Sequence, residues 1–227
     1  MEENAYLIIH GFGGSTEEIE YLERYLHEKG LNTHTVLLAG HGAGKRELKK
    51  SSYVQWIASV EETVNTLKQQ YRYIHLIGFS MGGLISAQVS SAPEIGKIVF
   101  VNTPIYFWNV EIIARDVVDN IRNKKFDKIS YYKKSVMGAS VKSGIDFLKI
   151  LSKSKRLFKN IQNRALIVQC REDESVHFKS AQYIKGKMGD RAALRYYDGG
   201  RHKVFAVPEL RDEVCKDIYC FLAEDSV

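Results

Sequence analysis

The chain has 227 residues, of which 44% are hydrophobic and 26% are charged, with a formal net charge of +6. This length and composition indicate one globular domain and exclude a collagen, a coiled coil or a disordered chain. No apolar run approaches the roughly 18 residues that span a membrane. The N-terminus lacks the basic start and long apolar core of a secretory signal. Three cysteines cannot pair completely and are not spaced for zinc, so we interpret them as small packing residues. We therefore expect a cytoplasmic protein with no stable membrane insertion.

Apolar runs alternate with amphipathic segments along the chain. Six short apolar runs predict strands at residues 6–9, 35–38, 73–77, 98–101, 165–168 and 194–197. Apolar residues at helical spacing predict helices marked by Ile19 to Leu26, Val54 to Leu67, Leu84 to Val89 and Val214 to Leu222. Strands that alternate with helices indicate an α/β fold: a mainly parallel sheet of about six strands with helices on both faces.

One interval, from Thr103 to about Asn163, contains no clear strand. We interpret about 104–162 as a small helical cap, inserted after the fourth strand of a single domain that spans 1–227. Residues 121–160 carry twelve Lys or Arg against two acidic residues. Such charge can attract nucleic acid or anionic lipid, but a solvated helical face is the favoured interpretation. Because no recognised module accompanies the charge, we expect no nucleic-acid partner.

A Gly-x-Ser-x-Gly motif, Gly78 to Gly82, follows a predicted strand and opens a predicted helix. A serine on such a tight turn projects its hydroxyl at the sheet edge, and the glycines let the backbone approach closely. The motif therefore predicts Ser80 as a nucleophile. The alternative is a turn whose serine only caps the helix.

A serine hydroxyl needs a general base, and that base needs an orienting acid. Asp173 and His202 each lie five residues beyond the end of a predicted strand, in the order that this motif requires. Both side chains would meet Ser80 at the carboxyl edge of the sheet. The sequence therefore predicts His202 as base and Asp173 as acid.

Other acids and histidines compete for these roles. The acidic candidates that we consider weaker are Glu172, Glu174, Asp198 and Asp116. Among the histidines, His27, His34 and His75 lie inside predicted elements, and His177 lies in a helix-forming stretch. We expect His10 to be a structural hydrogen-bonding residue beneath the loop that follows the first strand.

Acyl transfer also needs donors for an oxyanion. We predict the backbone N–H groups of Met81 and of Phe12, which lies in the glycine-rich loop from His10 to Gly14. Such a loop could instead cradle a phosphate, but it lacks the Gly-Lys-Ser/Thr ending of a P-loop. It also has Thr16 where the dinucleotide motif places its third glycine. No metal and no cofactor are expected.

With these motifs the chain resembles the small bacterial carboxylesterases and monoacylglycerol lipases of the α/β-hydrolase superfamily. The matching segments are 10–14, 40–42, Trp56, 78–83, 103–104, 169–174 and 200–202. Two departures are Arg201, where a glycine commonly precedes the histidine, and Ala39, where a proline is usual. The resemblance implies that the insertion covers an acyl pocket.

The predicted function is hydrolysis of short- to medium-chain acyl esters or monoacylglycerols through an acyl-enzyme intermediate. Residues that could line the acyl site are Gly11, Phe12, Ile105, Tyr106, Phe107 and Trp108; the aromatic ones could equally form the core of the cap. Open alternatives are a thioesterase, a lysophospholipase, an acyltransferase, a haloperoxidase, a lyase or a non-catalytic ligand-binding member of the fold. The expected partner is a small-molecule ester, and the sequence does not indicate an oligomeric state.

Overall fold

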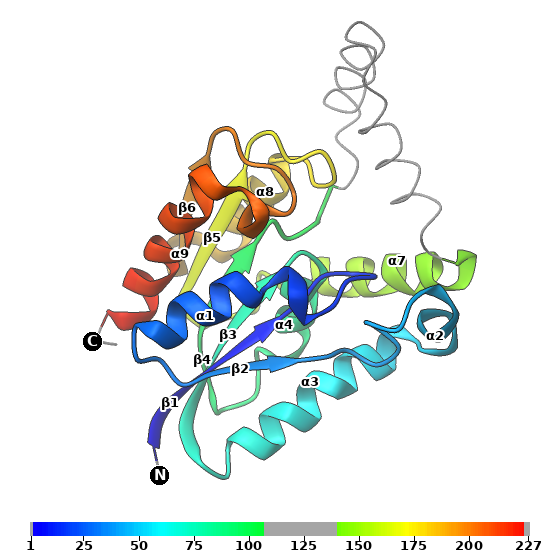
Figure 1. Cartoon of the computed structure of the whole chain (residues 1–227), viewed down its shortest axis with the longest axis horizontal. Coiled ribbons are helices and arrows are strands. Elements are labelled where there is room, and N and C mark those ends of the chain that lie inside the picture. Colours follow the sequence, from blue (N-terminus) through cyan, green and yellow to red (C-terminus); the bar gives the residue numbers. More distant parts are fainter. Residues whose placement is uncertain (1, 107–139, 225–227) are drawn as a thin grey trace, which may run out of the picture.

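In the computed structural model, residues 2–106 and 140–224 are described, and they form a six-stranded sheet surrounded by helices (Figure 1). The strands are β1 (Glu2–Ile9), β2 (Thr33–Val36), β3 (Tyr71–Phe79), β4 (Ile95–Val101), β5 (Ala165–Cys170) and β6 (Ala192–Tyr197). All neighbours pair in parallel, in the order β2-β1-β3-β4-β5-β6. From β1 the chain adds β2 on one side, and from β3 it adds β4 on the other side. Open α/β sheets place their sites at such a switch between neighbouring strands.

The helices pack on both faces because alternate residues of each strand point to opposite sides. The helices are α1 (Glu20–Glu28), α2 (Lys45–Lys50), α3 (Tyr53–Leu67), α4 (Met81–Val89), α7 (Val141–Lys155), α8 (Lys179–Met188) and α9 (Pro208–Ala223). Leu7 and Ile9 of β1 join a core shared with α3, α4, α7 and α8. Tyr6 and Ile8 join a second core shared with α1 and α9.

The structure confirms the predicted six-stranded α/β sheet, with two local corrections. The second strand was predicted at 35–38 but ends at Val36, and Leu37 beyond it is 54% exposed. Val54, which we assigned to the apolar stripe of α3, is 57% exposed. The short basic helix α2 was not predicted, because Leu48 is its only buried residue.

The described residues of the predicted cap are 104–106 and 140–162, and they include α7, which packs on α4. The Ser154 hydroxyl donates to the Leu84 carbonyl at 2.9 Å, and the Gln88 amide donates to the same hydroxyl at 2.9 Å. Residues 107–139 lie outside the described part, so the cap as a unit stays a prediction.

The three cysteines are free thiols. Cys170 and Cys215 are buried as expected, and burial raises the pKa of each thiol to about 12. Cys220 is exposed, so its interpretation as a packing residue was wrong. Among residues 2–106 and 140–224, no helix combines the length and the apolar character needed to cross a membrane.

Candidate active site

Ser80 occupies the turn between β3 and α4, and its φ of 52° lies in the left-handed region that few non-glycine residues adopt. A side chain at Gly78 would place Cβ 2.4 Å from the Gly83 nitrogen, and one at Gly82 would place it 2.2 Å from the Ile9 carbonyl oxygen. Only glycine therefore lets α4 begin tightly against β3 and the end of β1. This packing explains the spacing of the motif and directs the serine hydroxyl outward.

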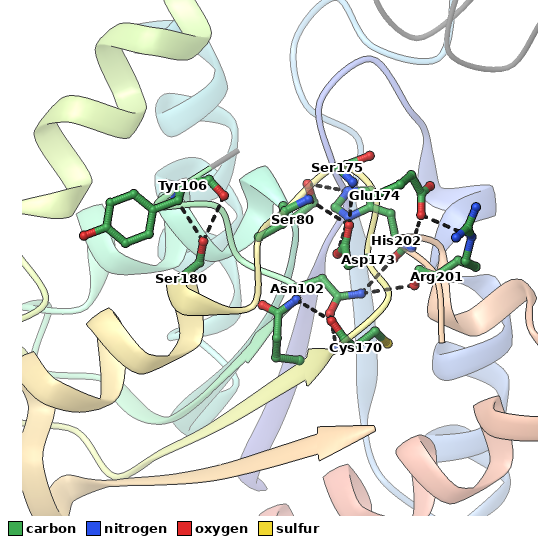
Figure 2. Close-up of polar contacts among 12 residues, drawn as sticks. Ser80, Asn102, Tyr106, Cys170, Asp173, Glu174, Ser175, Ser180, Arg201 and His202 are labelled. Carbon is green, nitrogen blue, oxygen red and sulfur yellow. Dashed lines mark hydrogen bonds and ion pairs between the residues drawn. The ribbon is translucent and has the colours of Figure 1, made fainter. Parts of the chain in front are cut away.

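Two hydrogen bonds connect Ser80, His202 and Asp173, which come from three separate strand ends (Figure 2). The Ser80 hydroxyl lies 3.0 Å from His202 Nε2, and His202 Nδ1 lies 2.8 Å from Asp173 Oδ2. Because a carboxylate only accepts, Nδ1 carries the proton and Nε2 is left as an acceptor facing the serine. The structure thus brings together the three residues that the sequence singled out.

Asp173 is held in place by the backbone of its own loop. Its Oδ1 accepts from the N–H groups of Ser175 and Val176, each at 2.8 Å, and the residue is fully buried. One carboxylate oxygen is therefore satisfied by the chain, and the other is directed at the histidine.

The carboxylates around His202 raise the pKa of its ring. Burial acts to lower the pKa, but the Asp173 carboxylate, and beyond it Glu174 and Glu18, outweigh burial and raise the pKa above its ordinary value. Those charges stabilise the imidazolium that forms when a histidine accepts a proton.

The remaining acids near Asp173 have other partners. Glu172 accepts from the Gly199 N–H at 2.8 Å, and Glu174 accepts from the His202 N–H at 3.3 Å and pairs with Arg201 at 3.5 Å. Asp198 forms an ion pair with Arg171 at 3.2 Å, and Asp116 lies outside the described residues.

Two of the other histidines make structural hydrogen bonds. His10 donates from Nδ1 to the Gly11 carbonyl at 2.8 Å and accepts the Leu38 N–H at Nε2, so it braces the following loop as expected. Burial lowers its pKa, which keeps the ring neutral. His177 lies just before α8, where its ring accepts the Lys179 N–H, instead of inside a helix.

The loop that follows β1 lies directly beside Ser80. A Cβ on Gly11 would come within 3.2 Å of the Ser80 Cβ, and Met81 is the buried first residue of α4. The Phe12 ring packs 5.2 Å from Phe147 of α7 and 5.6 Å from Trp56 of α3. Phe147 was not singled out from the sequence, because a helical phenylalanine does not reveal which loop it contacts.

The predicted acyl-site residues lie in different places. Ile105 is buried in the core that β1 shares with α3, α4, α7 and α8, and the Tyr106 ring contacts Tyr183 and Lys155. Figure 2 shows Tyr106 pointing away from Ser80, so the structure does not bring this side chain to the serine. Phe107 and Trp108 lie outside the described residues. In the part of the chain that is described, no group of three or more His, Cys, Asp or Glu side chains could hold a metal ion.

Comparisons with known proteins show the family to which the chain belongs. A family model described as the alpha/beta hydrolase fold matches residues 5–206. The chain is 30% identical to a carboxylesterase of Bacillus subtilis (strain 168) over 97% of this chain and 92% of that protein. It is 31% identical to a thermostable monoacylglycerol lipase of Bacillus sp. (strain H-257) over 44% of this chain and 40% of that protein.

Solved structures show the same fold. A structure described under LipS and LipT, two metagenome-derived lipolytic enzymes, superposes with a TM-score of 0.80. The superposition covers 99% of this chain and 95% of that one, at 18% identity. Identity this low shows the fold alone.

Proposed function

This chain belongs to the α/β-hydrolase family, and we propose that it hydrolyses carboxylic esters with Ser80 as nucleophile, His202 as general base and Asp173 as orienting acid. The observation that carries the proposal is the continuous series of hydrogen bonds from the Ser80 hydroxyl through both ring nitrogens of His202 to Asp173. A serine used only as a helix cap would have no reason to contact a histidine so oriented.

In the proposed reaction, Ser80 Oγ attacks the ester carbonyl while His202 Nε2 accepts the hydroxyl proton. His202 then donates that proton to the leaving alcohol, which departs from an acyl-enzyme. A water molecule attacks the acyl group by the same route, and its proton passes through His202 to release the acid and restore Ser80. Asp173 remains ionised and stabilises the imidazolium in both halves.

The developing oxyanion needs donors beside Ser80. We assign the N–H of Met81, at the start of α4, and the N–H of Phe12. Two observations support this: Met81 is the first residue of α4, where a helix offers backbone donors without intrahelical partners, and Gly11 lies against Ser80. The backbone of the Phe12 loop is braced from below by His10.

For the acyl chain we propose an apolar site beside Phe12, bounded by Phe147 and Trp56, in place of the Tyr106 ring. The substrates that suit such a site are short- to medium-chain esters or monoacylglycerols. The names of the two Bacillus relatives support the same class.

A substrate panel tests the proposal. Purified protein would be assayed with p-nitrophenyl esters of increasing chain length, monoacylglycerols, lysophospholipids and acyl-CoA, each beside Ser80→Ala. We expect hydrolysis of the neutral esters that disappears in Ser80→Ala. Preference for acyl-CoA or a lysophospholipid would change the substrate class, and activity that persists in Ser80→Ala would contradict the proposed nucleophile.

A further inference from the structure

The end of β4 carries none of the three proposed catalytic residues, yet it contacts all three segments that do. The Ser80 N–H donates to the Val101 carbonyl at 2.8 Å. The Asn102 N–H donates to the Val168 carbonyl of β5, the strand that leads to Asp173, at 2.9 Å. Asn102 then reaches the histidine loop with its side chain.

The Asn102 side chain is fully buried and uses both ends of its amide (Figure 2). Its Oδ1 accepts the Cys170 N–H at 2.9 Å, and its Nδ2 donates to the His202 carbonyl at 2.9 Å and toward the Arg201 carbonyl at 3.5 Å. One side chain thus bridges the end of β5, three residues before Asp173, and the backbone of His202.

The backbone of Asn102 restricts which residue can stand there. Its φ is 46°, in the left-handed region that asparagine tolerates better than most residues. The bridge also needs a donor and an acceptor at opposite ends of a short planar group, which an amide supplies. Backbone and side chain together therefore select asparagine.

On this geometry, and resting on the function proposed above, we propose that Asn102 is a positioning residue that holds His202 between Ser80 and Asp173. The backbone of His202 is held on two sides, since Glu174 accepts its N–H and Asn102 donates to its carbonyl. Lys203, the next residue, pairs with Glu18 at 2.9 Å. Losing Asn102 frees the carbonyl side, and a misplacement of about 1 Å can lower a rate by about 100-fold.

The test compares two asparagines at opposite ends of β4. Asn102 directly follows the last residue of the strand, and the Asn163 side chain contacts its first residues. Asn102→Gly removes the bridge and suits a left-handed backbone. The matched control is Asn163→Gly, because the Asn163 amide also donates to two carbonyls, those of Ile95 and Gly96, each at 2.8 Å. We expect Asn102→Gly to lower kcat for ester hydrolysis by about 10- to 100-fold with KM nearly unchanged. Asn163→Gly should keep the wild-type kcat per folded molecule.

A second measurement follows the pKa of the His202 ring by NMR, which needs no substrate. Weakened contact with Asp173 should lower this pKa in Asn102→Gly and leave it unchanged in Asn163→Gly. The other charged groups around the ring, Glu174, Glu18 and the neighbouring Arg201 and Lys203, are retained in both variants.

Asn102→Asp serves as the second variant, since it keeps an acceptor for the Cys170 N–H and a residue that tolerates the backbone. It replaces the Nδ2 group that donates to the His202 carbonyl with a carboxylate oxygen, which only accepts, so kcat should again fall by about tenfold or more. A folded Asn102 variant with wild-type kcat and wild-type His202 pKa would overturn the proposal. So would failure of both Asn102 variants to fold while Asn163→Gly folds, because the role would then be stability. If the wild type does not hydrolyse esters, the proposed function fails, and the NMR titration still decides the role of Asn102.

Discussion

Two histidines, one buried inside a strand and one partly buried in a loop at the edge of the sheet, show how surroundings decide a role. His202, at the carboxyl edge, lies among Asp173, Glu174 and Glu18, and these carboxylates raise its pKa despite burial. His75, inside β3, accepts the Lys97 N–H at 2.8 Å, and its Nε2 lies 3.2 Å from the Asn4 side chain. Burial, and then the charge of Lys97, lower its pKa to about 4. The first ring is poised to gain a proton beside a serine, whereas the second is kept neutral as a structural hydrogen-bonding group.

The largest contrast between the two rings should be in catalysis. Ser80→Ala and His202→Ala should each lower kcat by about 10⁴- to 10⁶-fold, because nucleophile and base act as one unit. His75→Asn, which preserves an acceptor for the Lys97 N–H, should keep wild-type kcat in the folded protein. Steady-state assays with the best p-nitrophenyl ester give all three values. If His202→Ala retained more than about a tenth of the activity, the assigned base would be wrong.

A smaller loss should follow from removing the charge that distinguishes the two sites. Asp173→Asn should lower kcat by about 10³- to 10⁴-fold, because the amide no longer fixes the Nδ1–H tautomer.

In the wild type, kcat/KM should rise with pH through an apparent pKa above 6.5, since His202 must be neutral to accept a proton and its pKa is raised. The same profile in Asp173→Asn should move to lower pH. An unchanged profile would show that Asp173 does not face the base.

The smallest effect concerns stability in acid. Above about pH 6.5 His75 is neutral in both the folded and the unfolded chain, so it adds no pH dependence. As the pH falls toward 4, His75 binds a proton in the unfolded chain but stays neutral in the folded protein, and the free energy of unfolding drops by about 2–3 kcal/mol. Urea unfolding at pH 7.5 and 4.5 measures how much of the free energy of unfolding is lost in acid. This loss should be smaller by that amount in His75→Asn than in the wild type. Equal losses in both proteins would contradict the lowered pKa.

The sheet could be predicted because buried parallel strands are continuous apolar runs. The prediction errs where pairing with the neighbouring strand, and not hydrophobicity, decides where a strand begins or ends. β2 spans Thr33 to Val36 because these residues pair with Tyr6 to Ile9 of β1, although the apolar residues of the segment continue to Leu38. The short helix α2 escaped prediction because one buried leucine makes no periodic pattern.

The proposed catalytic residues could be predicted because the motif fixes the serine and the strand ends fix where its partners follow. Asn102 and Phe147 could not, because their roles depend on contacts between distant segments: Asn102 binds a loop 100 residues away. A polar residue directly after a buried strand was the one available signal for Asn102. Glu174 was considered only as a rival of Asp173, whereas it contacts the backbone of the histidine loop.

The central claim, that Ser80 is a nucleophile activated by His202, is tested most directly by trapping. The protein would be treated with a fluorophosphonate, and the modified residue identified by peptide mass spectrometry. The account predicts one stoichiometric adduct on Ser80, absent in Ser80→Ala, strongly slowed in His202→Ala and unchanged in His75→Asn. An adduct on another residue, or equal labelling rates in His202→Ala and the wild type, would contradict it.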